Sequence, residues 1–523
     1  MRPFTTLRRA ASAALLLAAI AGEGAAESRA STPYGSALPR FALFGWAGPP
    51  RELTTAARYA EYARAGLNVA LLALNDPGTF AGNVTRLEVT RPLGLRNFLL
   101  DDDLDSVFIA RPETYALADS IVSRYRDDPA FLGYYLGDEP PADYFPRLGE
   151  WFEMLRRRDP AHPAWNSLGP RGAFPSQAAF ESYLRKYVEA THPAVLCNNQ
   201  YDFQIPVDQH FLTENIAAMG EVAREEGIPF WGVVQLVEHF IFREVTEGML
   251  RWEVAQWLAG GATGIGYFTY WTPPPNAEYD WQPAMIAWET GERTAYYAMV
   301  SALNARLAPL GNTLAGLHWT ATQHAGSVPR GGTAFSPDHV LLAVGGRATI
   351  GRFTDSLGTP HVFVGNSDSV TTRAITLTVQ SGRRVHRLRD DGGWDKLTIS
   401  PDGHLLLVLQ PGDFRLLRVL PGTATAGAEA EQASARVPLT SSPNPARGAI
   451  RFEVQGAPPG ARLELFDLGG RRVWTSRVLA ASRSVEWRGA GASGAPAPAG
   501  IYFARLSGSA GATPLRLVWL GAD

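Results

Sequence analysis

Two adjacent carboxylates, Asp138 and Glu139, lie between a short apolar run and a pair of prolines. The run, 131–137, is rich in Tyr and Phe and is too short for a typical helix, which predicts a buried strand. Pro140 disfavours helical torsions at Glu139, so the acidic pair is expected at the carboxyl end of that strand. Carboxyl groups in such a position can transfer protons, and in parallel α/β folds the carboxyl ends of the strands form the ligand site.

The region 38–309 must position this pair, and it alternates between strand-like and helix-like stretches. The expected strands are 41–46, 69–74, 97–100, 131–137, 163–166, 194–199, 229–235 and 264–270. Thr54 is expected to cap the first helix, and the last helix is expected over 289–307. This order predicts a (β/α)₈ TIM barrel in the α/β class. A doubly wound open sheet is the alternative, but no strand leads into a Gly-rich phosphate-binding turn.

In a TIM barrel the carboxyl ends of all strands lie at the same mouth, so the polar and aromatic side chains at the expected strand ends form one candidate site. The candidate site residues are Trp46, Asp76, Asp101 (with Asp102 and Asp103), Asp138, Glu139, Asn166, Asn199, Gln235, Glu238, Tyr270 and Trp271. The set contains no His cluster for zinc, no Ser-His-Asp arrangement and no phosphate-binding loop, so we expect no metal and no organic cofactor. Carboxylates for proton transfer, amides for hydroxyl groups and aromatic rings for sugar faces are what glycoside hydrolysis requires.

Several candidates also have a purely structural interpretation. Glu238, beside His239 in a loop, could be a surface residue without a catalytic role. Glu139 could cap the following helix or bind an arginine, although the strand and the paired acid favour catalysis. Trp46, Tyr270 and Trp271 are expected to line the site, with barrel packing as the alternative. His239 and the single cysteine are interpreted as incidental.

Two runs of sequence resemble TIM-barrel glycoside hydrolase-like proteins. The run 133–140 resembles their Gly-Tyr-Tyr-x-Gly-Asp-Glu-Pro segment, and 230–270 resembles their seventh and eighth strand region. The resemblance covers residues 40–308 and implies the layout of the clan A glycosidases, which carry the acid/base Glu after strand four. Glu139 matches that position.

The sequence departs from the clan pattern at two positions. Asp138 stands where the clan usually has Asn, and strand seven ends in Gln235 where the clan has its nucleophilic Glu. Glu238 is the leading candidate for the second carboxylate. Retention with Glu238 as nucleophile stays open, as does inversion with Glu238, Asp138 or one of 101–103 as base. A carboxyl separation of about 5 Å supports retention, and about 6.5–9.5 Å supports inversion.

The two ends of the chain predict export and attachment. Basic residues, an apolar run of about a dozen residues and small residues within 1–26 are typical of a signal peptide rather than a membrane span. The segments expected after the barrel are a β-sandwich over 310–420, a linker over 421–437 and a final domain over 438–523. Its segments 442–445, 463–470, 485–489 and 499–503 follow one another in the order of a known family. Through them the domain resembles the FlgD-type Ig-like and sorting domains of secreted bacterial proteins, which implies cell-surface or secretion-machinery contact.

These features together predict a secreted glycoside hydrolase that acts on an oligo- or polysaccharide. The formal net charge of -3 lacks the excess of positive charge that is typical of nucleic-acid-binding proteins. The 14 Trp residues suit stacking on sugar rings. Two alternatives stay open: a glycan-binding barrel that has lost hydrolysis, and a cell-surface attachment protein.

Overall fold

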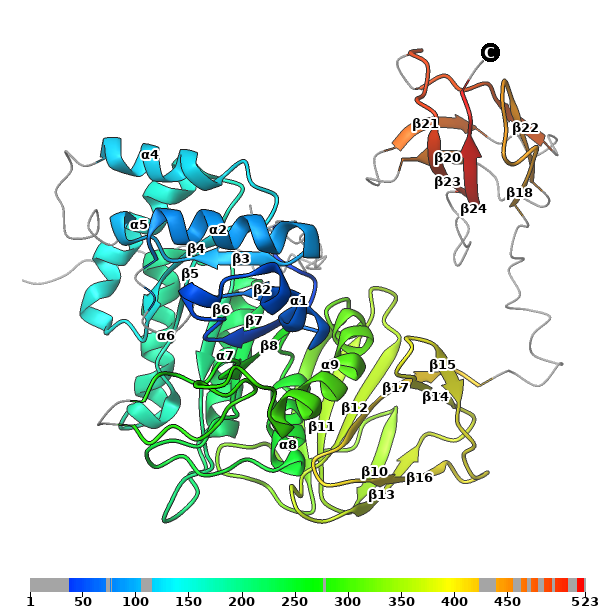
Figure 1. Ribbon diagram of the computed structural model, residues 1–523. Helices are drawn as coiled ribbons and strands as arrows, with labels where there is room; N and C mark the ends of the chain where they lie inside the picture. Colours follow the sequence, from blue (N-terminus) through cyan, green and yellow to red (C-terminus); the bar gives the residue numbers. More distant parts are fainter. Residues whose placement is uncertain are drawn as a thin grey trace, which may run out of the picture. The chain divides into compact units, whose positions relative to one another are not determined.

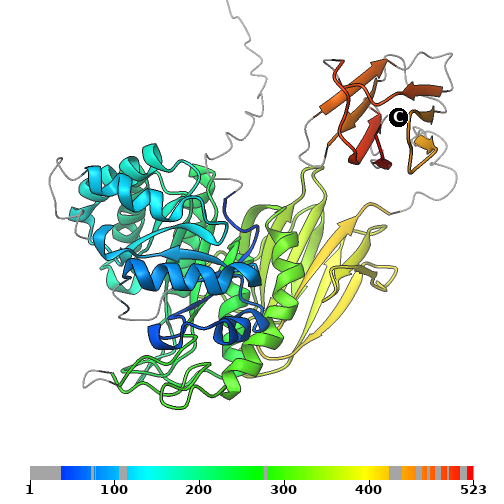
Figure 2. The same cartoon turned by 45° about the horizontal axis from the view of Figure 1, so that its top comes forward.

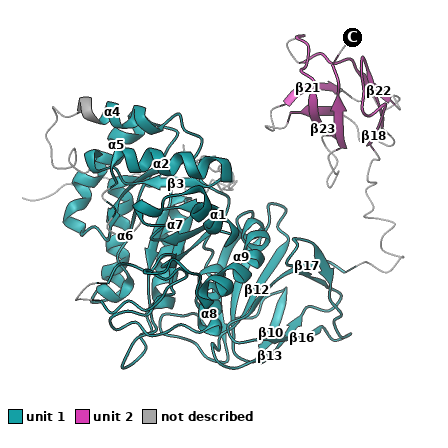
Figure 3. Ribbon diagram, viewed as in Figure 1, with its two compact units in different colours: residues 1–422 teal, residues 423–523 magenta. Residues whose placement is uncertain are grey.

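The structure, a computed structural model, describes eleven stretches of the chain. They are 37–71, 76, 78–104, 115–275, 279–422, 439–454, 462–467, 472–477, 484–491, 494–506 and 515–521. The chain forms two compact units, Met1–Gly422 and Thr423–Asp523 (Figure 3). Within these stretches, no helix has the length and apolar character needed to cross a membrane. The predicted signal peptide lies outside the described residues, as does the predicted linker from residue 423 onward.

A closed ring of eight parallel strands forms the centre of the first unit (Figure 1). The strands are β1 (Ala42–Trp46), β2 (Val69–Ala70), β3 (Arg96–Leu99), β4 (Phe131–Asp138), β5 (Ala164–Ser167), β6 (Leu196–Asn199), β7 (Phe230–Gln235) and β8 (Gly264–Phe268). A parallel bridge between Leu168 and Asn198 closes the ring between β5 and β6, where Leu168 N–H donates to Cys197 O at 2.8 Å. The predicted TIM barrel is confirmed.

Aromatic side chains fill the inside of the barrel. The ring centroids of Trp165 and Trp231 lie 6.0 Å apart, and Phe44 and Phe98 contact both tryptophans. Cys197 is buried in the same cluster. This packed interior forms a floor, so a ligand can reach only the ends of the barrel.

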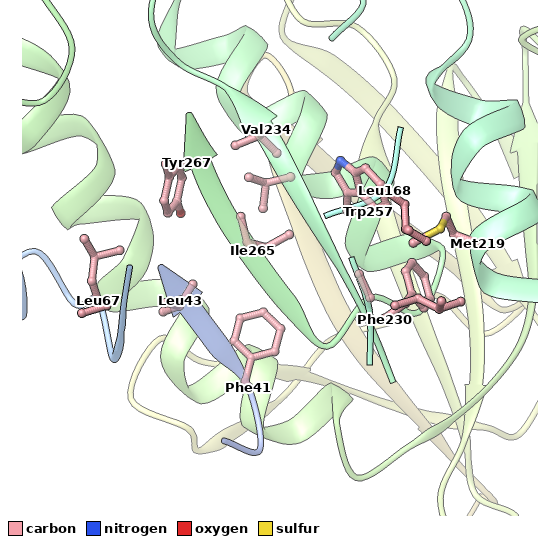
Figure 4. Close-up of a cluster of buried hydrophobic side chains, with 14 of the residues drawn as sticks. Phe41, Leu43, Leu67, Leu168, Met219, Phe230, Val234, Trp257, Ile265 and Tyr267 are labelled. Atoms are coloured by element: carbon pink, nitrogen blue, oxygen red, sulfur yellow. The ribbon is translucent and has the colours of Figure 1, made fainter. Parts of the chain in front are cut away.

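The outer layer consists of helices whose apolar faces pack on the strands. They are α1 (Ala56–Arg64), α2 (Phe80–Thr90), α4 (Tyr115–Tyr125), α5 (Phe145–Arg158), α6 (Gln177–Thr191), α7 (Leu212–Glu226), α8 (Glu247–Ala259) and α9 (Ala295–Leu314). Figure 4 shows this contact, with Leu43, Ile265 and Tyr267 on strands and Met219 and Trp257 on helices.

The boundaries of two helices, α1 and α9, differ from the prediction. Thr55, not Thr54, caps α1 by accepting from Arg58 N–H, because the Thr54 hydroxyl instead donates to Pro50 O. The last helix, expected over 289–307, begins at Ala295, runs to Leu314 and contains Pro309. Burial of Leu310 and Leu314 stabilises the turns around this proline, which outweighs its missing N–H donor.

The rest of the first unit is a β-sandwich that packs on the barrel beside α8 (Figure 2). One sheet has the order β10 (Leu341–Gly345), β13 (Arg373–Val379), β16 (His404–Leu409). The other has the order β15 (Trp394–Lys396), β14 (Arg384–Leu388), β17 (Phe414–Leu420), β12 (Pro360–Asn366), β11 (Ala348–Thr354), β9 (His318–Ala325). Trp319 Nε1 donates to Ala259 O at 3.0 Å, and the Thr349 hydroxyl donates to Gln256 Oε1 at 3.0 Å.

The second unit contains two antiparallel sheets around a small core. The sheets are β18 (Leu439–Ser442), β19 (Ile450–Val454), β22 (Ser484–Trp487), and β21 (Arg472–Arg477), β20 (Arg462–Phe466), β23 (Gly500–Leu506), β24 (Leu515–Trp519). Trp487 and Trp519 lie in its core, with ring centroids 4.8 Å apart. Two packed antiparallel sheets confirm the expected β-sandwich, while the FlgD-type relationship stays a prediction.

Candidate active site

A cleft of about 730 Å³ opens where the carboxyl ends of the strands meet. Its lining mixes carboxylates, amides and aromatic rings. The lining residues are Trp46, Asp138, Glu139, Ser167, Pro170, Gly172, Asn199, Gln200, Tyr201, Gln204, Gln209, Phe211, Val233, His239, Phe240, Phe242, Phe268, Tyr279 and Trp281. Every one of them belongs to the barrel or its loops, so the described part of the sandwich does not contribute to the lining.

Both carboxylates at the end of β4 face this cleft. Successive side chains of a regular strand point to opposite faces, but Glu139 has φ 44° and Gly137 has φ 108°, which breaks the alternation. The left-handed conformation costs a non-glycine residue about 1–2 kcal/mol. The Glu139 N–H donates to Ser167 O at 2.8 Å and stabilises this conformation.

Residues with a strained, left-handed backbone conformation lie in or beside the cleft. Four non-glycine residues in the described part of the chain have a positive φ: Ala47, Glu139, His192 and Phe240. Glu139 and Phe240 line the cleft, and Ala47 directly follows the lining residue Trp46. Such strained residues cluster at functional sites, where the surrounding structure holds them in place.

The pKa values of the two carboxyls are raised. Both side chains are open to solvent in the cleft, but the walls keep water from much of each carboxyl. Desolvation and the nearby charge of Asp138 raise the pKa of Glu139 to about 7, against a hydrogen bond from Asn199. Desolvation raises the pKa of Asp138 to about 6, against a hydrogen bond from Ser167. Between these values Glu139 is largely protonated while Asp138 is largely ionised.

Side chains from β5 and α6 support the backbone on both sides of the acidic pair. The buried side chain of Asn166 donates from Nδ2 to Gly137 O at 3.1 Å. The Tyr183 hydroxyl donates to Pro140 O at 2.9 Å. These contacts fix the backbone on both sides of Asp138 and Glu139, so Asn166 is a positioning residue beneath the cleft.

An aromatic wall forms another side of the cleft. His239 stacks on Trp281 with a centroid distance of 4.5 Å and an interplanar angle of 18°, and Tyr279 lies 5.3 Å from Trp281. His239 Nδ1 lies 3.0 Å from Val237 O, which can only accept, so this nitrogen carries the proton. Burial lowers the pKa of His239, which favours the neutral ring. His239 therefore lines the cleft, and the interpretation of this residue as incidental is wrong.

Two predicted acidic candidates lie in ion pairs outside the cleft. Asp76 is buried and pairs with Arg86 at 2.8 Å. Asp101 is buried, accepts a short hydrogen bond from the Tyr125 hydroxyl and lies 3.7 Å from Arg124. Arg86 binds the Asp76 carboxylate and Tyr125 binds the Asp101 carboxylate, so both carboxylates have partners outside the cleft lining.

The candidates from strands seven and eight also lie outside the cleft lining. Gln235 is fully buried, and its Nε2 donates to Phe203 O at 3.1 Å and Arg243 O at 2.9 Å. Glu238 is half-buried, and its charge contributes to raising the pKa of Tyr296 on α9. Tyr270 and Trp271 are buried in the barrel packing. Their strand ends turn these side chains toward helices or loops rather than toward the mouth.

Trp46, Asp138, Glu139 and Asn199 are therefore the predicted residues that the structure brings together. Sequence reasoning missed the residues Ser167, Gln200, Tyr201, His239, Phe268, Tyr279 and Trp281. Ser167 and Gln200 lie one residue beyond expected strand ends, which was a usable signal, and Phe268 lies within the last expected strand. Tyr279 and Trp281 lie on a long loop without such a signal. No group of three or more His, Cys, Asp or Glu that could hold a metal occurs within the described stretches.

The fold and the site define a (β/α)₈ barrel with an acidic, aromatic cleft at its mouth. No protein-family model and no curated protein matches the chain. Solved structures with a similar fold include a family 39 glycoside hydrolase from the gut symbiont Bacteroides cellulosilyticus WH2, at 12% identity and a TM-score of 0.45, covering 73% of this chain and 81% of that one. A family 5 glycoside hydrolase from Bacteroides vulgatus ATCC 8482 is similar at 12% identity and TM-score 0.46, covering 74% and 91%.

A third similar structure is an α-amylase from Anoxybacillus, at 11% identity and a TM-score of 0.44, covering 74% of this chain and 99% of that one. Similarity at this level carries no argument about activity.

Proposed function

We propose that the protein is a glycoside hydrolase that cleaves O-glycosidic bonds of an oligo- or polysaccharide, with Glu139 as the general acid. The observation that carries this proposal is the raised pKa of Glu139, about 7, in a cleft of aromatic rings and amides. A carboxylic acid that stays protonated near neutral pH can donate its proton to the glycosidic oxygen. Aromatic rings stack on sugar faces, and Asn and Gln side chains bind hydroxyl groups.

A glycan-binding barrel without hydrolysis is the second candidate function. It is favoured by Gln235, which stands at the end of β7 and is committed to two backbone carbonyls. Within the described lining, Asp138 and Glu139 are the only carboxylates, and both come from the end of β4. A binding protein would use the same rings and amides but would need no acid.

A screen of aryl glycosides and polysaccharides with the wild type and the Glu139→Gln variant tests the choice between these functions. Hydrolysis by the wild type and a loss of about 10²–10⁴-fold in kcat for Glu139→Gln support the enzyme. Glu150→Gln, on the exposed face of α5, is the matched control and should keep full activity. Equal activity of Glu139→Gln and the wild type would remove Glu139 from the mechanism. Binding of a glycan without turnover would instead support the second candidate.

The same screen tests Glu238 as the second carboxylate. Its position outside the cleft lining predicts that Glu238→Gln keeps most of the wild-type activity. A loss as large as that of Glu139→Gln would return Glu238 to the mechanism.

We also propose export through the signal peptide in 1–26 and attachment or sorting through 438–523. The composition of these segments supports both roles. Fractionation of cells that express the full chain, with mass spectrometry of the mature N-terminus, tests export. Deletion of 438–523 should leave hydrolysis intact and change only where the protein accumulates.

A further inference from the structure

The two sides of the cleft differ in chemistry. In the order of the ring, the end of β8 lies diametrically across from the end of β4. Phe268 ends β8 and contacts the Tyr201 ring at 5.8 Å, while Val233 of β7 and Phe242 continue the same wall. A substrate held between these sides meets carboxyl groups on one side and an apolar, aromatic surface on the other.

This arrangement restricts how a glycosidic bond could be broken with retention. A nucleophile must reach the anomeric carbon from the face opposite the leaving group, and the acid must reach the leaving group. Asp138 directly precedes Glu139, so both carboxyls approach from the same strand end. Asp138 is therefore poorly placed to attack the opposite face, but it is well placed to contact the substituent next to the anomeric carbon.

We propose that the substrate is a 2-acetamido-2-deoxy glycoside whose own acetamido oxygen is the nucleophile, with Asp138 binding the acetamido N–H. This inference rests on the proposed function and deepens it. The apolar surface of Val233 and Phe268 suits the acetamido methyl group, because a methyl group buried there leaves water at no polar cost.

The chemical step balances without a further reactant. Glu139 gives its proton to the glycosidic oxygen as the bond from that oxygen to the anomeric carbon breaks. The acetamido oxygen forms a bond to the anomeric carbon, which gives a cyclic oxazolinium ion whose positive charge Asp138 stabilises. Water then attacks the same carbon, its proton goes to the Glu139 carboxylate, and the ring opens to the acetamido sugar with retained configuration.

The protonation states of the pair fit these two roles. Asp138 accepts hydrogen bonds from the Ser167 hydroxyl and the Glu139 N–H, which favour its ionised form. The resulting negative charge favours the protonated form of Glu139. One acid and one anion side by side are what the step requires.

The test compares paired aryl glycosides that differ only at C2, acetamido against hydroxyl, with the full-length protein. We expect kcat/KM to be at least about 10²-fold higher for the acetamido series, and we expect NMR of the first-formed product to show retained anomeric configuration. Replacing the acetamido group by trifluoroacetamido, a weaker nucleophile, should lower kcat. Asp138→Asn should lower kcat for the acetamido substrate about 10²-fold, whereas Asp143→Asn, on the exposed segment after β4, should not.

The outcomes separate this inference from the function on which it rests. Efficient hydrolysis of the hydroxyl series, an inverted product, or an unchanged rate for the trifluoroacetamido substrate would overturn the acetamido mechanism. Dependence on Glu139 in those same assays would leave the glycosidase function standing. Hydrolysis of neither series, in a protein that still binds glycans, would overturn both.

Discussion

The backbone N–H of Glu139 donates to the carbonyl oxygen of Ser167 at 2.8 Å, across the β4 and β5 strand ends. The same serine donates its hydroxyl to the Asp138 carboxylate. Ser167 therefore fixes the backbone of one carboxyl residue and favours the charged form of the other. This contact supports the unusual backbone conformation of Glu139, whereas the raised pKa values of both carboxyls come mainly from desolvation.

The rate of hydrolysis should depend on pH through both carboxyls. Glu139 must be protonated, so kcat/KM falls as the pH rises through about 7, and Asp138 must be ionised, so it falls as the pH drops below about 6. A pH series of kcat/KM should show a bell between these limits. Asp138→Asn removes the charge that raises the pKa of Glu139, so the alkaline limb of its residual activity should move to lower pH. An unmoved limb would contradict the electrostatic coupling.

Asn199→Ala should move the same limb in the opposite direction. The Asn199 side chain donates a hydrogen bond to Glu139, which favours the ionised carboxylate. Its removal should raise the pKa of Glu139 and extend activity to higher pH, with a rise in KM from the lost substrate contact. The pH profile of kcat/KM measures the shift, and a limb at lower pH than in the wild type would refute this role.

Glu139→Gln should stabilise the fold at alkaline pH and not at acidic pH. The pKa of Glu139 is higher in the folded protein than the usual pKa of a glutamate. The ionised carboxylate therefore destabilises the folded state, and the protonated carboxyl does not. As the pH rises from about 4 through 7, the folded state holds a proton that the unfolded state has lost, and the stability falls. Thermal unfolding at pH 5 and pH 8 should show a gain in Tm for Glu139→Gln mainly at pH 8. An equal gain at both values would point to packing instead of ionisation.

Asp76→Ala should lower the free energy of unfolding without changing kcat. It forms a buried ion pair with Arg86, whose Nε also donates to the Tyr59 hydroxyl at 3.1 Å. Asp76→Ala leaves the arginine charge buried without its partner, which should lower the free energy of unfolding by about 3–5 kcal/mol. The folded fraction should keep its kcat. Urea unfolding measures the loss, and the double variant Asp76→Ala/Arg86→Met should recover part of it.

Gln235→Glu should destabilise the protein without creating a nucleophile. The Gln235 amide donates to two backbone carbonyls. An ionised Glu at this position has no N–H to donate, and its oxygens would repel both carbonyl oxygens. The loss of these donors should lower the free energy of unfolding by about 1–3 kcal/mol. The exposed substitution Gln282→Glu is the control and should change stability little. A gain in hydrolysis by Gln235→Glu would show that the position does reach the substrate.

The sequence predicted the barrel and its central acidic pair because both depend on local patterns. Short apolar runs bounded by turn residues predicted strands near their observed positions, and Pro140 predicted the end of β4. The helix α2 was not anticipated, and α9 passes through a proline that was expected to lie outside it. Helix boundaries depend on packing as well as on local propensity, which is why they were less predictable.

Local sequence patterns did not predict the direction in which each side chain at a strand end points. Gln235 ends β7 and Asp101 closely follows β3, whereas Asp76 lies six residues beyond β2. Partners on other elements hold all three side chains away from the mouth.

His239 and Trp281 are 42 positions apart in the chain, and only the closed barrel stacks their rings. Local torsions and apolar spacing determine where a strand ends, whereas a side chain points to the partners that long-range packing brings within reach. The sequence alone therefore identified Asp138 and Glu139, and the tertiary structure decided which residues surround them.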